Sequence, residues 1–64
     1  MTPTDLLGLI RKRQVTPARL CAIFGFDPQH HATADKVVAK LLRKKYDMRH
    51  AAVAIEYEAA HRNP

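Results

Sequence analysis

The 64-residue sequence predicts an all-α protein, folded as a small four-helix bundle in a single domain. Two observations support this fold class. Apolar residues recur at intervals of three and four positions along most of the chain, which is the spacing of an amphipathic helix. Residues that typically cap helix N-termini precede four such segments. A chain of this length has room for only one small core.

The first helix is expected to begin at Pro3. Thr2, Pro3 and Asp5 have the spacing of an N-cap, a first helical residue and the acidic third residue of a capping box. An apolar face follows at helical spacing, formed by Leu6, Leu7 and Ile10. The basic run at 11–13 suits the end of this helix, because the helix dipole favours cations there.

A second, short helix is predicted over residues 17–24. Thr16 is its N-cap and Pro17 its first residue, while Gly25 supplies the left-handed residue that ends many helices. The Asp-Pro pair at 27–28 offers another cap, so the chain is predicted to turn sharply between two helices. An ordinary helical hairpin has the same features. Arg19 is expected to face solvent, and the expected core residues are Leu20, Cys21, Ile23 and Phe24.

The third helix has two candidate starting points. It begins either at Pro28, or at Ala34 after a loop that ends in an N-cap at Thr33; the second interpretation is favoured, with a short turn inside the loop. The helix is then expected to reach Lys45, with Tyr46 packing at the end of the core. Its predicted inner face consists of Val37, Val38, Leu41 and Leu42, and its outer face of Lys36, Lys40, Arg43 and Lys44.

A fourth helix is predicted from Met48 to about Arg62, capped by Asp47. Its apolar stripe consists of Met48, Ala52, Ile55 and Ala59, flanked by Ala51. Because no Gly or Pro separates it from the third helix, a single helix over residues 34–61 is an open alternative. The exposed end of such a helix would require a second chain, which predicts a homodimer through the C-terminal helix.

The charge of the chain is concentrated in the third helix. Eleven Lys and Arg residues against six Asp and Glu residues give a net charge of +5, which favours a polyanionic partner. Residues 34–50 hold six basic and two acidic residues, whereas residues 51–64 hold one basic and two acidic residues. A basic face also forms where lysines merely keep a small protein in solution.

The segments "DLLGLIRKR", "TPARLCAIFGFDP" and "TADKVVAKLLRKKYD" resemble the three helices of a helix-turn-helix domain of the winged-helix type. Leu20, Cys21, Gly25 and Phe26 match its second helix and turn, and the inner face of the third helix matches its recognition helix. The resemblance covers about residues 4–47. His31 stands where the compact motif has an aliphatic residue, so the match requires a longer turn. A C-terminal helix at about 48–62 replaces the wing.

This resemblance implies a transcriptional regulator whose third helix enters the major groove of double-stranded DNA. The candidate phosphate and base contacts are Lys36, Lys40, Arg43 and Lys44. If the third helix begins at Pro28, its first turns would add the base-reading candidates Gln29, His30, His31 and Thr33. The segments "MTPTDLLGLIRKR" and "KKYDMRHAAVAIEYEAAHR" are also similar to the Hha/YmoA family of helical modulators, which bind nucleoid proteins.

The sequence does not favour an enzyme, a metal site or a bound cofactor. It contains no catalytic triad pattern, no phosphate-binding glycine loop and no Cys or His pair at zinc-binding spacing. A membrane partner is not expected either, because no apolar run approaches about 20 residues. The single Cys and the lack of a signal-peptide pattern favour a cytoplasmic location. The alternative function is an adaptor or inhibitor that docks its basic face on an acidic surface of a larger protein, such as a polymerase.

Overall fold

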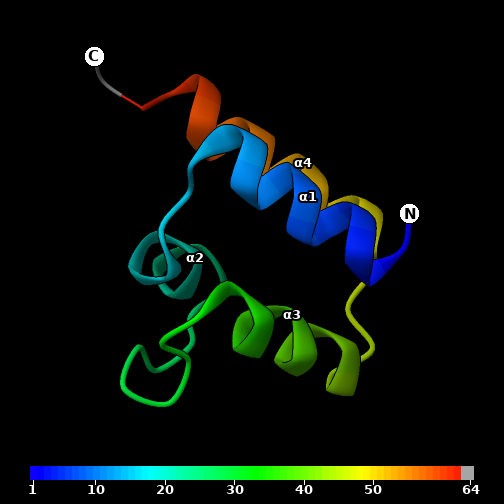
Figure 1. Cartoon of the computed structure of the whole chain (residues 1–64), viewed down its shortest axis with the longest axis vertical. Coiled ribbons are helices and arrows are strands. Elements are labelled where there is room, and N and C mark those ends of the chain that lie inside the picture. The colour runs from blue at the N-terminus through cyan, green and yellow to red at the C-terminus, as the bar shows by residue number, and fades with distance from the viewer. Residues whose placement is uncertain (63–64) are drawn as a thin grey trace.

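The computed structural model describes residues 1–62, which form four helices connected by short segments (Figure 1). These are α1 (Pro3–Arg13), α2 (Pro17–Phe24), α3 (Ala34–Arg43) and α4 (Met48–Ala60). The described residues contain no strand, which confirms the all-α fold class. Helices α1 and α4 contact each other and run in the same direction, while α3 runs in the opposite direction on the other side of the bundle. Helix α2 contacts both α3 and α4.

All four predicted N-caps are present. The hydroxyl of Thr2 accepts a hydrogen bond from the backbone N–H of Asp5 at 3.1 Å, and the Asp5 carboxylate accepts one from the Thr2 N–H at 3.1 Å. Thr16 and Thr33 each accept a bond at 3.2 Å from the N–H three residues ahead. The Asp47 carboxylate accepts one from the Arg49 N–H at 2.8 Å. Each helix therefore begins where the sequence predicts, because these bonds satisfy N–H groups that lack partners inside the helix.

Three helices end in a residue with a left-handed backbone. Gly25 does so at φ 74°, as predicted, whereas Gln14 at 57° and Lys45 at 56° adopt this conformation without being glycine. In each case the N–H of the following residue donates to a carbonyl of the last helical turn: Val15 to Ile10, Phe26 to Cys21, and Tyr46 to Leu41. These are Schellman-type endings, and each places a hydrophobic residue directly after the helix.

Two predictions for this part of the chain are wrong because Lys45 has a left-handed backbone. Helix α3 ends at Arg43 instead of Lys45, and the continuous helix over residues 34–61 is wrong. The Lys45 N–H donates to the Leu42 carbonyl at 3.0 Å, which turns the chain away before Asp47 caps α4. The last helix ends at Ala60, slightly before the predicted end.

Between α2 and α3, residues 25–33 form a loop with a turn at 28–30, and α3 begins at Ala34. The favoured interpretation of this segment is confirmed, and a third helix that begins at Pro28 is wrong. The corner at Gly25 is present, but the connection that follows it is much longer than the three or four residues of a compact helix-turn-helix.

One core lies between the four helices. Its buried side chains are Leu6, Ile10, Val15, Leu20, Cys21, Val37, Val38, Leu41, Met48, Ala51, Ala52 and Ile55. Val15 joins it because the end of α1 folds this residue back onto the helix. Leu42 is 47% exposed, contrary to its predicted place in the core, because it lies about 100° around α3 from Leu41, beyond the face that the other helices cover. Ile23 and Phe24 are half-buried and pack against this core, and the exposed Tyr46 packs edge-on against Phe24 with ring centroids 5.5 Å apart.

Candidate nucleic-acid interface

Helix α3 presents a row of cations outside its buried face. Lys36, Lys40 and Arg43 follow at helical spacing, and Lys44 comes directly after the helix. We call these four residues the basic face. Three of them are exposed and Lys40 is half-buried. Ala39, also exposed, lies between them. Three of the four cations of the predicted outer face are thus exposed, and α3 itself lies on the side of the bundle away from α4 (Figure 1).

The charges of the basic face are not compensated within residues 1–62. The ion pairs there join Arg13 to Glu56, Arg19 and Arg62 to Glu58, and His30 to Asp27. None includes a residue of the basic face. The carboxylates of Asp5 and Asp47 accept hydrogen bonds from backbone N–H groups at helix starts, and the sixth, that of Asp35, lies in the first turn of α3. Most of the acidic groups are thus engaged elsewhere, which leaves the positive field of α3 available to a partner.

The other four predicted site residues lie in or at the end of the loop before α3. The Asp27 carboxylate accepts a hydrogen bond from the Gln29 N–H at 2.9 Å, and the Asp27 carbonyl accepts one from the His30 N–H at 3.1 Å. A ring nitrogen of His31 lies 2.8 Å from the same carbonyl. The His31 ring also packs against Phe26, with ring centroids 5.2 Å apart.

The four loop residues do not occupy the positions that a helix beginning at Pro28 would give them. Gln29 and His30 are exposed in the turn, but His31 is half-buried and its carbonyl accepts from the Cys21 thiol at 3.4 Å. The Thr33 hydroxyl is engaged as the cap of α3. None of the four lies in the first turns of a recognition helix. Their prediction as base-reading residues required a helix that begins at Pro28, and α3 begins at Ala34 instead.

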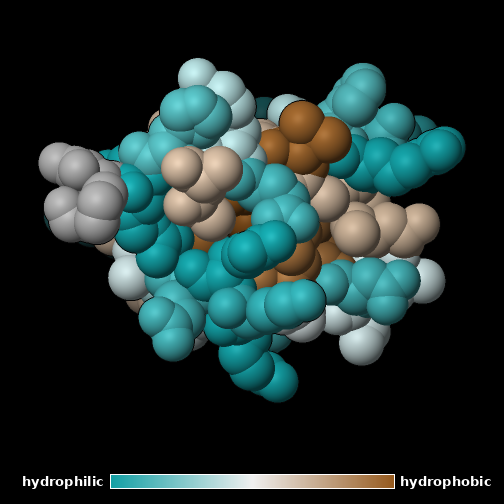
Figure 2. Space-filling view, turned by 90° about the horizontal axis from the view of Figure 1, so that it is seen from above, coloured by the Kyte–Doolittle hydropathy of each residue, from teal (hydrophilic) through white to brown (hydrophobic). Residues whose placement is uncertain are grey.

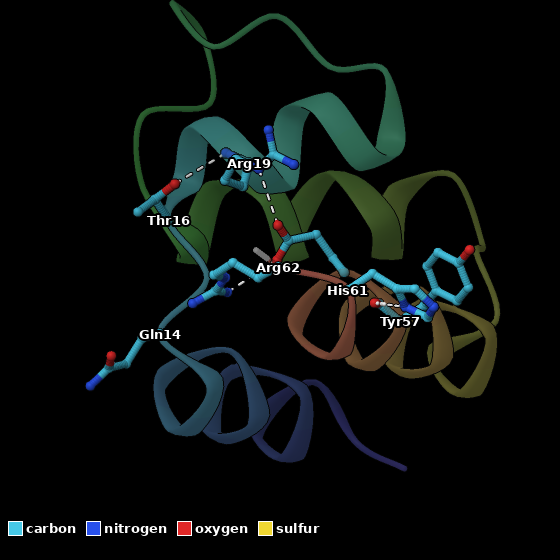
Figure 3. A pocket seen from close by; sticks show the side chains of 7 residues that line it. Gln14, Thr16, Arg19, Tyr57, His61 and Arg62 are labelled. Atoms are coloured by element: carbon cyan, nitrogen blue, oxygen red, sulfur yellow. Dashed lines mark hydrogen bonds and ion pairs between the residues drawn. The ribbon is translucent and has the colours of Figure 1, made fainter. Parts of the chain in front are cut away.

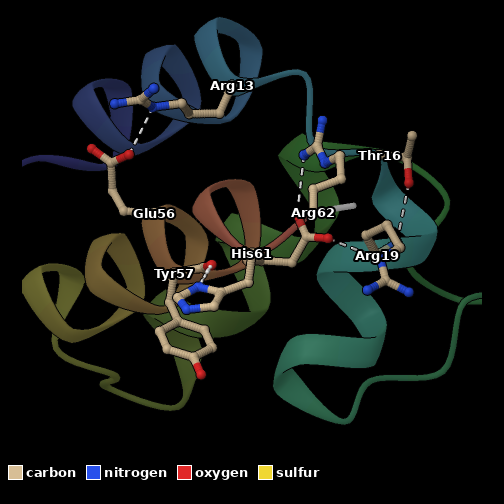
Figure 4. A network of polar contacts seen from close by, with 8 residues as sticks. Arg13, Thr16, Arg19, Glu56, Tyr57, His61 and Arg62 are labelled. Carbon is tan, nitrogen blue, oxygen red and sulfur yellow. Dashed lines mark hydrogen bonds and ion pairs between the residues drawn. The ribbon is translucent and has the colours of Figure 1, made fainter. Parts of the chain in front are cut away.

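A second polar cluster joins α4 to its neighbours, and the sequence analysis did not predict it (Figure 4). The Glu58 carboxylate accepts from Nε of Arg19 at 3.2 Å and from the guanidinium of Arg62 at 3.0 Å. On the other side of α4, Nε of Arg13 lies 2.7 Å from the Glu56 carboxylate. The hydrogen bond from Arg62, followed by that from Arg19, lowers the pKa of Glu58 from its ordinary value.

Arg19 was expected to face solvent, and its side chain is indeed 61% exposed, yet it binds Glu58, whose side chain is only 10% exposed. In the sequence, only the small number of carboxylates in a basic chain indicates that Glu58 would form an ion pair with a distant arginine. Residues 39 positions apart meet here because α2 packs against α4.

A pocket of about 460 Å³ lies beside this cluster (Figure 3). Its lining residues are Gln14, Thr16, Arg19, Tyr57, Glu58, His61 and Arg62. The Tyr57 ring stacks on that of His61 with centroids 3.9 Å apart. The two arginines of the pocket both bind its one carboxylate, which leaves one positive charge in excess. Helix α3 contributes no lining residue, so the pocket is separate from the basic face.

Within the described part of the chain, no three His, Cys, Asp or Glu side chains gather closely enough to hold a metal ion. Among the same residues, no helix has both the length and the apolar character needed to cross a membrane. Comparison of the chain with protein-family models, with curated protein sequences and with solved structures gave no match in any of the three.

Proposed function

We propose that this protein binds double-stranded DNA through the basic face of α3 and acts in transcription control. The observation that carries DNA binding is the row of cations of α3 that form no ion pair within residues 1–62, in a chain of net charge +5. The role in transcription rests on the resemblance of the sequence to helix-turn-helix domains.

The dimensions of α3 suit this partner. The major groove of B-DNA is about 12 Å wide and admits an α-helix. Lys36 and Arg43 lie about 10 Å apart along the helix axis at 1.5 Å per residue, which spans several phosphates of a duplex. Ala39, between them, has no long side chain to hold the helix away from the groove. Lysines bind phosphates as point charges, so most of these contacts would position the protein without reading sequence.

A salt titration tests the proposal. Binding of a labelled duplex is measured between about 50 and 200 mM salt for the unaltered protein and for two double variants of equal charge. Lys40→Gln with Arg43→Gln removes two cations of the basic face, so the slope of log affinity against log salt should shrink by about 0.9 per lost contact. Arg11→Gln with Lys12→Gln removes two exposed cations of α1 and should change the slope less.

Two results would reject DNA binding through this face. One is the absence of measurable duplex binding at about 50 mM salt. The other is an equal change of slope in the two double variants, which would indicate attraction by net charge alone.

The alternative function, an adaptor on an acidic protein surface, is favoured by one observation. Leu42 and Tyr46 are 47% and 41% exposed beside the cations at the end of α3. Apolar groups next to cations add little to phosphate binding but serve as anchors in protein interfaces. Replacement of Leu42 by Ser should leave duplex binding and its salt slope unchanged if DNA is the partner. No duplex binding, together with capture of an acidic protein that Leu42→Ser abolishes, would establish the adaptor.

A further inference from the structure

Helix α4 has an outward side that carries hydrophobic groups. We define it as the outer strip, consisting of His50, Val53, Ala54, Tyr57, Ala60 and His61. Val53 is 66% and Tyr57 64% exposed, more than any other large hydrophobic residue in the described part of the chain. They stand four positions apart and therefore next to each other on the helix. The side of the bundle formed by α1 and α4 shows hydrophobic side chains at the surface among hydrophilic ones (Figure 2).

The buried residues Met48, Ala51, Ala52 and Ile55 set which side of α4 faces the core, and ion pairs lie on both sides of the helix. Glu56 binds Arg13 of α1 on one side, and Glu58 binds Arg19 of α2 on the other (Figure 4). Rotation of α4 to bury Val53 or Tyr57 would remove the fully buried Ala51 and Ile55 from the core. The exposure of the two hydrophobic residues is thus maintained by the packing of the helix.

The amino-acid composition of the strip indicates which kind of partner would bind to it. It contains no Lys, Arg, Asp or Glu, although 27% of the chain is charged and the net charge is +5. Arg49, which is exposed one turn before Val53, and Arg62 stand at its border, so a polyanion or an acidic protein would find fixed charge only at the edge of the strip. Two copies of this basic chain repel each other least where neither presents a cation. We propose that the outer strip is a homodimer interface, in which α4 of one copy packs against α4 of a second copy.

An antiparallel crossing around a two-fold axis makes the strip complementary to itself. If the axis passes between Val53 and Tyr57, the tyrosine of each copy lies over the valine of the other, so this contact occurs twice. Ala54 and Ala60 are small enough to let the two helices approach. One exposed strip on a helix about 20 Å long buries less than a standard protein interface. The dimer should therefore be weak and dissociate on dilution.

This association does not depend on DNA binding. Helices α3 and α4 lie on opposite sides of the bundle (Figure 1), so the dimer leaves the basic face of both copies exposed. The double variant Lys40→Gln with Arg43→Gln should lose affinity for DNA and keep the self-association of the unaltered protein. The two proposals can thus fail separately.

Sedimentation velocity from about 10 μM to 1 mM protein tests the proposal. The weight-average mass should rise with concentration from the 7.3 kDa of one chain towards twice that value. Val53→Lys with Tyr57→Lys should hold the protein monomeric over this range, while circular dichroism confirms that it remains helical. Ala39→Lys with Leu42→Lys adds the same charge at exposed positions of α3 and should change the dimer dissociation constant less than threefold.

Three outcomes would overturn the proposal. The first is a mass of one chain for the unaltered protein at 1 mM, which would leave the strip to a different partner. The second is normal association of the folded Val53→Lys, Tyr57→Lys variant. The third is equal loss of association in the α3 control, which would show that net charge, not the strip, governs it.

Discussion

Glu58 near the end of α4 accepts a hydrogen bond from Nε of Arg19 in α2 at 3.2 Å, across 39 positions of sequence. Arg62, one turn later in the chain, donates to the second oxygen of the same carboxylate at 3.0 Å. A single carboxylate therefore connects the last helix to α2. The buried residues Ala51 and Ile55 hold α4 on the core, and this connection adds a contact with α2 near the end of the helix.

The first prediction concerns the effect of pH on this connection. The pKa of Glu58 is lowered in the folded protein by the hydrogen bonds from Arg62 and Arg19, relative to an ordinary value of 4.5. Its contribution to stability is complete above about pH 4.5 and is lost as the pH falls through the lower folded value. Glu58→Gln should therefore lower the melting temperature at pH 7 and reduce the loss of stability between pH 4.5 and more acidic solutions.

Glu56→Gln is the matched control, because it removes the same charge from the same helix. The ion pair of Glu56 with Arg13 is about 45% exposed on both sides, and exposed pairs contribute little to stability. Thermal melts of both variants from pH 3 to pH 7 give the comparison. An equal effect of the two substitutions would contradict a special role for Glu58.

The second prediction contrasts the two glycines of the chain. Gly25 has φ 74° and no neighbouring atom within 4 Å of an added Cβ, so Gly25→Ala should cost about 1 kcal/mol through backbone strain alone. Gly8, inside α1, is equally open but lacks a positive φ. Gly8→Ala should therefore stabilise the protein by about 0.5–1 kcal/mol, because alanine favours the helix. Urea denaturation measures both, and a change of the same sign in the two variants would refute the explanation.

The third prediction uses two adjacent leucines of α3. Leu41 is fully buried, so Leu41→Ala should cost about 2–5 kcal/mol by leaving a cavity. Leu42 is 47% exposed, and Leu42→Ala should change the free energy of unfolding by less than about 1 kcal/mol. Chemical denaturation of both variants provides the values. A large cost at Leu42 would place this side chain in the core, as its apolar character alone predicts.

The fourth prediction concerns Gln14, which ends α1 with a left-handed backbone at φ 57°. Glycine adopts this conformation without a steric cost, so Gln14→Gly should raise the free energy of unfolding by up to about 1 kcal/mol. Gln14→Val should lower it, since a β-branched residue tolerates this region least. The melting temperatures of the two variants should therefore move in opposite directions, and a decrease in both would contradict the prediction.

Local chemistry in the sequence predicted the fold class, the corner at Gly25 and the starts of three helices, and it favoured the correct one of two starts for α3. Each of these depends on a bond or a conformation within a few residues, such as the hydroxyl of Thr16 with the Arg19 N–H. A cap works in the same way wherever the helix later packs, so short-range chemistry suffices to predict it. The outer row of cations on α3 was predictable for a similar reason, because helical periodicity alone places Lys36, Lys40 and Arg43 together.

The packing of the helices against one another sets which residues of each apolar face are buried and which charged residues far apart in sequence form pairs. Leu41 and Leu42 have the same chemistry, but the positions of the neighbouring helices bury one and expose the other. The left-handed Lys45 divides α3 from α4 where no Gly or Pro marks a boundary, because this turn lets both helices pack on one core. Arg19 reaches Glu58 only after α2 and α4 are in contact. These features depend on contacts between residues far apart in sequence, which local propensity and periodicity do not encode.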